Sequence, residues 1–484
     1  MQFNQGGEGP MGASGKTMTK DAAAASALGD GGVEAAEEHV EVVRFAAAID
    51  VAKGSGMVCS RVPGSCGDRK RQTVWQVDAT YRSVIALMDH LRCEGIQRLV
   101  LESTGDYWRC WYYLAEAAGL EVWLVNAKDV KHLPGRGKSD RQDCVWLCKL
   151  NERGMLRRSF VPPEAIRDLR ALTRTRARLA QDQVRHQSRV EKVLEDALLK
   201  ISGVISDLFG VSGRRFLDAL VAGERSPAAL AALGDGRLKA SPQRLAEALT
   251  GRFRDIHAVE IATHLRLIDA INDEIARLDE RIEQQLAAIP GVAPACIACG
   301  LIGGGHAPGC VRDRTPVPGL IERLDEITGV GARNAQVLIA ELGTDMSVFP
   351  AGHAAAWARL TPRTRQSGTT ARPGRTGKGR PVPARRARPV RDGRGTYRYP
   401  ARRDVPADSP RRGKQKGTVA VSRVICEIAW LLIADRDARF TDLGADYYNV
   451  RNPRQQTRSR IREIERLNPG IKVILAPAGP APAA

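Results

Sequence analysis

Between residues 42 and 158, short apolar segments alternate with amphipathic ones, and this alternation constrains the fold more than any other feature. Strand-like apolar runs fall at residues 45–51, 58–62, 74–77, 98–102 and 121–126. Helix-like runs fall at residues 81–93 and 108–118. Strands that alternate with helices are typical of an α/β layer fold. We therefore expect an α/β domain over residues 42–158.

Two long helical patterns follow in residues 159–289. The first begins near Ile166 and continues past Val190 on a surface that is dense in arginine. In the second, apolar residues recur at steps of three and four from Ile261 to Ile289, with charged residues between them. This pattern predicts a coiled coil. A helical hairpin within one chain and a seam between two copies of the chain both satisfy it.

A glycine turn marks the third region, residues 321–450. Residues 324–343 predict two helices joined by Gly329-Val330-Gly331. Backbone N–H groups at such a turn can bind a phosphate at the start of the second helix. A helix-hairpin-helix element of this kind would contact the DNA backbone without reading its sequence. The same pattern also occurs in plain connections between helices.

Composition and charge narrow the class of function. The chain has 484 residues, with 74 Lys+Arg against 55 Asp+Glu and a net charge of +19. Such a charge favours a polyanionic partner, most simply nucleic acid. The longest apolar run is too short to cross a bilayer, and the expected disordered extension at residues 1–41 contains no apolar signal-peptide core. We expect a cytoplasmic, nucleoid-associated protein that makes no contact with a membrane.

Four acidic residues occupy positions that suit chemistry in the α/β domain. Asp50 ends the first strand and Glu102 ends a later one, while Asp140 and Asp143 lie three residues apart and share one helix face. Carboxylates that gather in one place need a neutralising charge, and two Mg²⁺ ions, which prefer oxygen ligands, would supply it. A pair of such ions can promote phosphodiester chemistry. Taken singly, each acid also suits a helix cap or a solvated position.

Three sequence motifs surround these acids. They are AIDVAK at 48–53, ESTGDY at 102–107 and GKSDRQD at 137–143. In order, spacing and strand or helix context, they resemble the motifs of the DEDD transposases of the bacterial insertion-sequence group IS110. The resemblance continues through the central helices to ITGVG at 327–331, LTPRTRQSG at 360–368 and FTDLGADYY at 440–448.

The resemblance implies an RNase H-like (RuvC-like) α/β domain at 42–158, a helical coiled-coil middle at 159–289 and a mostly α transposase domain at 321–450, followed by a tail at 451–484. It implies that two Mg²⁺ ions bind to four acids, namely Asp50, Glu102, Asp140 and Asp143. Ser367, in the matching Gln-Ser-Gly motif, would be the nucleophile that forms a covalent phosphoserine link to DNA. The family thus points to a DNA transposase, or site-specific recombinase, that moves an insertion sequence.

The resemblance also implies partners. These are DNA, a structured guide RNA encoded by the element, and further copies of the chain in a dimer or tetramer. Base pairing with the RNA would then select the DNA sites. The residues expected to contact nucleic acid are Lys138, Arg141, Gly329, Gly331, Arg363, Arg365, Arg375 and Lys378. Two other functions remain open, namely a simple metal-dependent nuclease in which Ser367 is incidental and a catalytically impaired nucleic-acid-binding remnant.

Two stretches depart from the family pattern. The Gly/Cys-rich insert at 290–320 carries four soft ligands that can form a tetrahedral zinc site. These ligands are Cys296, Cys299, His306 and Cys310. Residues 380–412 hold eleven Arg and six Pro where the family has a helix of small and apolar residues. That tract is either a basic arm that binds nucleic acid by releasing counterions or the product of two compensating frameshifts, which would impair catalysis at Ser367.

Overall fold

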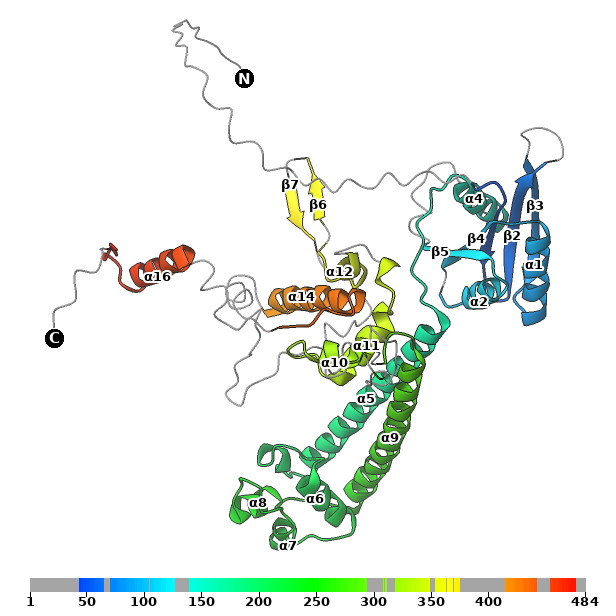
Figure 1. Ribbon diagram of the computed structural model, residues 1–484. Coiled ribbons are helices and arrows are strands. Elements are labelled where there is room, and N and C mark those ends of the chain that lie inside the picture. Colours follow the sequence, from blue (N-terminus) through cyan, green and yellow to red (C-terminus); the bar gives the residue numbers. More distant parts are fainter. Residues whose placement is uncertain are drawn as a thin grey trace, which may run out of the picture. The chain divides into compact units, whose positions relative to one another are not determined.

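The protein is described by a computed structural model (Figure 1). It describes residues 43–64, 70–103, 105–126, 139–293, 308, 310, 318–348, 353–362, 364–368, 370–374, 414–441 and 453–475. The chain forms two compact units, Met1–Val161 and Pro162–Ala484. Among the helices of these described ranges, none combines the length and the apolar character needed to cross a membrane.

The first unit is built on a mixed sheet of five strands. They are β1 (Ala46–Val51), β2 (Ser55–Pro63), β3 (Lys70–Asp78), β4 (Arg98–Ser103) and β5 (Glu121–Asn126), in the spatial order β3-β2-β1-β4-β5. Strand β1 is antiparallel to β2 and parallel to β4, and β4 is parallel to β5. Because parallel neighbours end at the same edge of a sheet, the carboxyl ends of β1, β4 and β5 share one edge.

Helices cover both faces of this sheet (Figure 1). Helices α1 (Tyr81–Cys93) and α2 (Arg109–Ala117) pack on one face over a core that includes Ile49, Leu101 and Trp111. Helix α4 (Asp140–Glu152) packs on the other face over a core of smaller side chains. The alternation of side chains along each strand directs successive residues to opposite faces, so the two cores are built from alternate residues of the same strands.

The sequence predicts much of this unit. The α/β class is confirmed, and the structure shows the expected sheet with helices and a mostly helical remainder. The helix predicted at 81–93 and the strand predicted at 121–126 have the same bounds in the structure. Strand β1 begins one residue later than predicted, whereas β2, β3 and β4 extend past the apolar runs by one to four residues at an end, because backbone pairing with neighbours continues there.

The second unit begins with two long helices, α5 (Glu164–Asp196) and α9 (Asp255–Ala288), which lie side by side (Figure 1). They run in opposite directions, since Arg176 near the start of α5 pairs with Asp279 near the end of α9 while His186 contacts His264. This arrangement is a hairpin within one chain. Whether the two helices form a coiled coil, or also meet a second copy, stays a prediction.

Short helices close one end of this hairpin. They are η1 (Ile201–Gly203), α6 (Val211–Val221), α7 (Pro227–Ala232) and α8 (Pro242–Ala248). Ser226 and Ser241 cap α7 and α8, and each is followed by a proline at the first helical position. Phe216 and Leu220 of α6 join a buried cluster with Leu194 of α5 and Leu265 of α9, so one apolar core holds this end of the hairpin together.

Over the part that the structure describes, the second unit continues with several short elements and one long helix. They are α10 (Leu320–Asp325), α11 (Ala332–Leu342), η2 (Met346–Val348), α12 (His353–Trp357), β6 (Thr364–Ser367), β7 (Thr370–Pro373) and α14 (Lys414–Ala434). A further helix, α16 (Pro453–Leu467), lies in the tail. Buried arginines join these elements: Arg323 of α10 donates to Leu432 O at 2.8 Å, and Arg170 of α5 donates to Ala340 O of α11 at 2.9 Å.

Candidate functional site

Asp50 and Glu102 lie side by side at the carboxyl edge of the sheet. They directly follow Ile49 and Leu101, which are paired across the parallel strands β1 and β4. Both carboxylates belong to the α4 face, because Ala48 and Val100, two residues before them, pack in the core under α4. Glu102 is buried and Asp50 is half-buried. The sheet therefore brings two of the four expected acids to neighbouring positions.

Helix α4 begins at the same edge. The Cys144 thiol donates to Ala48 O of β1 at 3.3 Å, and the Cys148 thiol, one turn later, donates to Ala46 O at 3.4 Å. The contact on β1 thus moves backwards as α4 advances, so the helix runs antiparallel to the strand. Its first turn, which carries Asp140 and Asp143, therefore lies toward the carboxyl end of β1, where Asp50 stands.

Local interactions explain why α4 begins at Asp140. Ser139 is the N-cap, and its Oγ accepts a hydrogen bond from the Gln142 backbone N–H at 3.3 Å. The backbone N–H of Asp143 donates to Ser139 O at 2.8 Å and closes the first turn. Acidic side chains in this turn are favoured by the partial positive charge of the helix N-terminus. Asp140 is exposed and Asp143 is half-buried, so both can be reached from the edge of the sheet.

A buried amide fixes the position of α4 further along. Asn151 donates through Nδ2 to Ala47 O at 3.2 Å and to Arg98 O at 3.1 Å, and thereby contacts β1 and β4 together. Its side chain is 1% exposed. Hydrogen bonds in a buried position tolerate little displacement of the partners, because a displaced partner would leave a buried polar group unpaired. Asn151 therefore sets where α4 lies along both strands.

The Cys144 and Cys148 thiols of α4 are neutral groups, whereas their hydrogen bonds lower the pKa of the neighbouring Cys59 to about 4. Burial raises the pKa of the Cys144 thiol well above its ordinary value, and the neighbouring Cys59 thiol and the Asp50 carboxylate raise it further. The hydrogen bond with Cys59, followed by burial, raises the pKa of Cys148 in the same direction. A protonated thiol is neither a nucleophile nor a metal ligand. Cys144 and Cys148 thus act on the site by position and leave its metal chemistry to oxygen donors.

The four acids suit a hard cation by donor type, since carboxylate oxygens are the ligands that Mg²⁺ prefers. Their backbone positions converge on one edge from β1, β4 and α4. Over the described ranges, however, no three His, Cys, Asp or Glu side chains gather closely enough to hold a metal ion. The structure therefore brings the ligand-bearing elements together without showing a finished ligand set, and the metal site stays a prediction.

Ser367 lies in the second unit, at the end of a short hairpin. It ends β6, is paired with Thr370 of β7, and precedes Gly368. Gly368 has a φ of +58°, in the left-handed region that glycine occupies without strain. The Gln-Ser-Gly motif thus covers the end of β6 and the start of the hairpin turn, where the positive φ of Gly368 favours glycine. Arg365, an expected nucleic-acid contact, is paired with Arg372 in the same hairpin.

The remaining predicted residues have varied outcomes. Gly329 has a φ of +88° in the turn between α10 and α11, and Gly331 is the N-cap of α11. Arg141 is exposed in the first turn of α4, and Cys310 is half-buried. Several predicted residues lie outside the described ranges, namely Lys138, Arg363, Arg375 and Lys378 among the nucleic-acid contacts and Cys296, Cys299 and His306 of the zinc set.

Sequence reasoning missed the residues that position α4. Cys144, Cys148 and Asn151 lie on the sheet-facing stripe of the helix, at spacings of four and three. A polar amide within an otherwise apolar stripe is a signal that could have identified Asn151, because such a residue needs a buried partner. Nothing in the sequence identifies that partner as the backbone of two strands.

Comparison with known families agrees with this geometry. A transposase model of the DEDD IS110 type matches residues 47–198, and a model described as the transposase IS116/IS110/IS902 family matches residues 321–387. The chain belongs to the IS110 family of transposases. The transposase domains of this family support a role in DNA transposition. All four acids of this transposase lie within the first match, and Ser367 lies within the second. No curated protein matches the transposase significantly.

Proposed function

We propose that this IS110 transposase cleaves and rejoins DNA at the carboxyl edge of β1 and β4, with Mg²⁺ held by Asp50, Glu102, Asp140 and Asp143. The observation that carries the proposal is the antiparallel course of α4, shown by the hydrogen bonds of Cys144 and Cys148 to β1. This course places the first turn of the helix at the edge where the two strand carboxylates end. Three elements thereby present oxygen donors to one region.

When bound, Mg²⁺ supplies positive charge that stabilises the phosphodiester oxygens during bond exchange. The roles of the protein follow from its own elements. Glu102 and Asp50 are held by a paired sheet, which keeps their backbone positions rigid. Asp140 and Asp143 are held by a helix whose place along β1 is fixed by buried hydrogen bonds. Rigid support of this kind is what a catalytic group needs to stay in productive geometry.

Ser367 is the proposed nucleophile for strand exchange. Its Oγ would attack a DNA phosphorus, so that an Oγ–P bond forms while the P–O bond to the leaving deoxyribose oxygen breaks. The serine proton leaves with water and the departing oxygen takes up a proton. A hydroxyl needs activation for this step. The hairpin turn supports the role, because it presents Ser367 and Gly368 at the tip of two paired strands.

Guidance by an element-encoded RNA and assembly into a dimer or tetramer complete the proposal. RNA pairing would choose the DNA site, while the protein would contact backbones through Arg141, the Gly329–Gly331 turn and the basic residues near Ser367. The exposed position of Arg141 at the start of α4 supports a contact beside the proposed cleavage site. Addition of the flanking noncoding RNA to a recombination assay should be necessary for activity.

The carboxylate assignment is tested by single Asp50→Asn and Glu102→Gln variants of the full chain. Each should lower Mg²⁺-dependent strand cleavage by at least about 10³-fold, because a neutral amide cannot balance the cation charge. Asp89→Asn, an exposed acid on α1 of the same unit, is the matched control and should cleave normally. Full cleavage by Asp50→Asn would remove the assignment.

The serine assignment is tested by trapping protein–DNA adducts on denaturing gels. Ser367→Ala should abolish the adduct, whereas Thr370→Ala, its partner across the hairpin, should retain it. Cleavage that persists in Ser367→Ala without an adduct would identify the protein as a nuclease that uses water. An adduct that persists in this variant would place the nucleophile elsewhere.

A further inference from the structure

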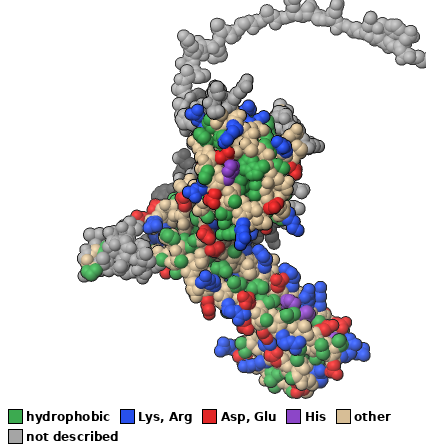
Figure 2. Space-filling view, turned by 90° about the vertical axis from the view of Figure 1, so that its right-hand side faces the viewer, with side chains coloured by type: hydrophobic (Ala, Val, Ile, Leu, Met, Phe, Trp, Pro, Cys, Tyr) green, Lys and Arg blue, Asp and Glu red, His purple; other side chains and the backbone are tan. Residues whose placement is uncertain are grey.

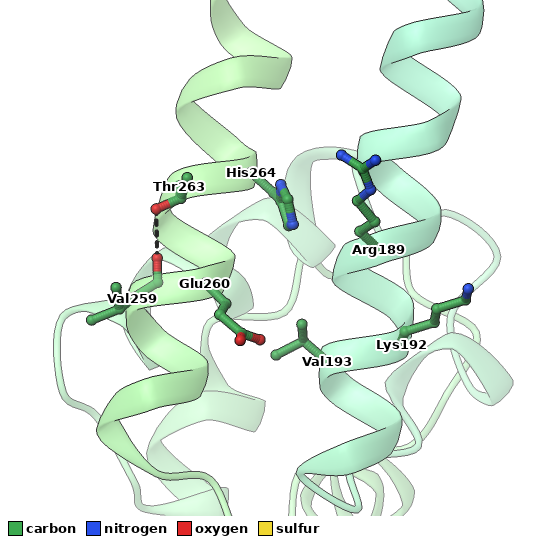
Figure 3. A pocket seen from close by; sticks show the side chains of 7 residues that line it. All are labelled: Arg189, Lys192, Val193, Val259, Glu260, Thr263 and His264. Atoms are coloured by element: carbon green, nitrogen blue, oxygen red, sulfur yellow. Dashed lines mark hydrogen bonds between the residues drawn. The ribbon is translucent and has the colours of Figure 1, made fainter.

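A groove lies between the two long helices, near the end that α6–α8 close (Figure 3). Its volume is about 400 Å³ and it is open to solvent. Helix α5 contributes Arg189 and Lys192 to one wall, and α9 contributes Glu260, Thr263 and His264 to the other. The Thr263 hydroxyl donates to Val259 O at 2.8 Å and accepts from the Arg266 guanidinium at 3.3 Å.

The walls of this groove carry an excess of positive charge. Arg189 and Lys192 are exposed, and neither forms an ion pair with any residue that the structure describes. Glu260 is the single carboxylate among the groove residues. Charged groups that lack an internal partner are available to a ligand of opposite sign, so the groove suits an anion.

Two histidines, one from each long helix, meet beside the groove. His186 Nδ1 of α5 lies 3.2 Å from His264 Nδ1 of α9. Burial lowers the pKa of His264, and the positive fields of His186 and Arg189 lower it further, against the opposing effect of Glu260. The positive charge of Arg189 beside this histidine agrees with an anion in the groove.

The basic wall extends beyond the groove along α5. Arg178, Arg185, Arg189 and Lys192 are separated by seven, four and three residues, which places all four on one side of the helix. Arg185 is paired with Asp182, while Arg178 has no ion-pair partner among the described residues. These four residues form the α5 basic stripe. Lys and Arg side chains are visible among acidic ones over the helical part of the molecule, with histidines beside them (Figure 2).

We propose that the α5 basic stripe and the adjoining groove bind the sugar-phosphate backbone of duplex DNA. The stripe spans 14 residues, or about 21 Å at 1.5 Å per residue. That length matches about six phosphates of one strand at about 3.4 Å of axial rise each. A row of basic residues of this length suits an extended backbone, whereas a free phosphate ion would contact only a small part of it. The inference rests on the proposed function for its DNA substrate. It adds a DNA-binding site that is remote in sequence from the cleavage residues.

The test is fluorescence anisotropy of the full chain on a 30-bp DNA duplex in EDTA, where no cleavage occurs. The variant Arg178→Ala/Arg189→Ala/Lys192→Ala should bind at least tenfold more weakly. The slope of log affinity against log salt should fall by about 2–3, because each lost phosphate contact removes about 0.9. The control Arg215→Ala/Arg244→Ala/Arg281→Ala removes the same charge elsewhere in the unit, at exposed residues outside the groove, and should lose at most about threefold.

Glu260→Gln gives a test of opposite sign. Removal of the carboxylate from the groove should tighten DNA binding by about two- to fourfold, which no unfolding of the variant could produce. Thermal melting of each variant, followed by circular dichroism, checks that the hairpin is intact. Unchanged or weaker binding by Glu260→Gln would contradict a phosphate in the groove.

Several outcomes would overturn the inference. Equal losses of DNA affinity in the stripe variant and its control would show that net charge alone explains the effect. No loss of affinity in the stripe variant would show that the stripe is not a DNA-binding site. A loss seen on a 30-bp RNA duplex but not on DNA would overturn the assignment to DNA. If the unmutated chain binds no DNA, the proposed function is refuted as well. If the unmutated chain and all the variants bind DNA equally, only this site is refuted.

Discussion

The two faces of the five-stranded sheet are packed by different means. Under α1 and α2, the strands contribute large side chains such as Ile49 and Leu101, and α2 adds the fully buried Trp111. Under α4, β1 contributes only Ala46 and Ala48, and the helix contacts strand carbonyls with thiols and an amide. Large apolar side chains fill the first face, whereas the second combines an apolar core with hydrogen bonds from α4 to the strand backbone.

The two faces therefore have different roles: packing on the first contributes mainly to stability, and packing on the second fixes the position of its helix. Apolar packing is non-directional and tolerates small shifts of a helix. Buried hydrogen bonds do not, and small residues on β1 allow α4 to approach closely enough to form them. The face that carries the expected catalytic acids is therefore the one whose helix is fixed in place. Four substitutions test whether this division holds.

Trp111→Ala should have the largest effect. Truncation of a fully buried tryptophan leaves a cavity and should lower the free energy of unfolding by about 3–5 kcal/mol. Urea denaturation measures it. DNA cleavage per folded molecule should be retained, because Asp50 and Glu102 lie on the opposite face. Cleavage that falls further than the folded fraction would break the comparison.

Gly56→Ala probes how tightly the same face is packed. An added Cβ would lie 2.8 Å from Ile49 Cγ2 and 2.9 Å from Trp111 Cζ2, so the core must shift. Overpacking of this kind should cost about 1–3 kcal/mol of unfolding free energy. Gly54→Ala is the matched control, since no atom lies within 4 Å of its added Cβ. Equal effects of the two alanines would show that the packing is loose.

Asn151→Ala tests the α4 face. Loss of two buried hydrogen bonds should lower the free energy of unfolding by about 1–2 kcal/mol. Cleavage should fall by more than tenfold at a temperature where the variant stays folded, because α4 also loses the contact that positions Asp140 and Asp143. Val84→Ala, a buried truncation on α1, serves as the comparison in stability. Normal cleavage by Asn151→Ala would show that the amide does not position the helix.

Cys144→Ser should have the smallest effect at neutral pH. A serine hydroxyl can still donate its one proton to Met57 O or Ala48 O, so the change should stay below about 1 kcal/mol. The folded-state pKa of Cys144 is raised above 9.0, so its stabilising contribution is complete below pH 9 and is lost as the pH rises above that value. Urea titrations at pH 7 and pH 10 should show a smaller alkaline loss in Cys144→Ser than in Cys93→Ser, which alters an exposed thiol.

The sequence predicts elements better than their mutual placement. Apolar runs locate the strands, and the Ser139 cap with the following acids locates the start of α4, because these signals are local. The direction of α4 across the sheet depends on contacts between residues about 100 positions apart, such as Asn151 with Ala47. No periodicity encodes such a pairing. The motif that contains Asp50 predicts a site, while its supporting residues emerge only from the packed structure.

The helical unit shows the same limit. Apolar steps in α9 predict a long helix and a partner for it, yet the hairpin pairing of His186 with His264 joins residues 78 positions apart. The arginine-dense surface of α5 is visible in the sequence, but which arginines lack an acidic neighbour is decided by the fold. Arg176 is held by Asp279, whereas Arg189 is not held by any described acid.

The spacing of the polar residues on α4 allows only one alignment of the helix along the strands of the sheet. Cys144 and Cys148 are interchangeable in chemistry, so a slide of four residues, about 6 Å, would let one thiol take over the other's contact with β1. Such a slide would bring Leu147, which has no side-chain donor, to the place of Asn151 in one direction, and in the other it would move the end of the helix at Glu152 past that place. The thiols alone would permit two alignments of the helix, and the single amide eliminates the ambiguity.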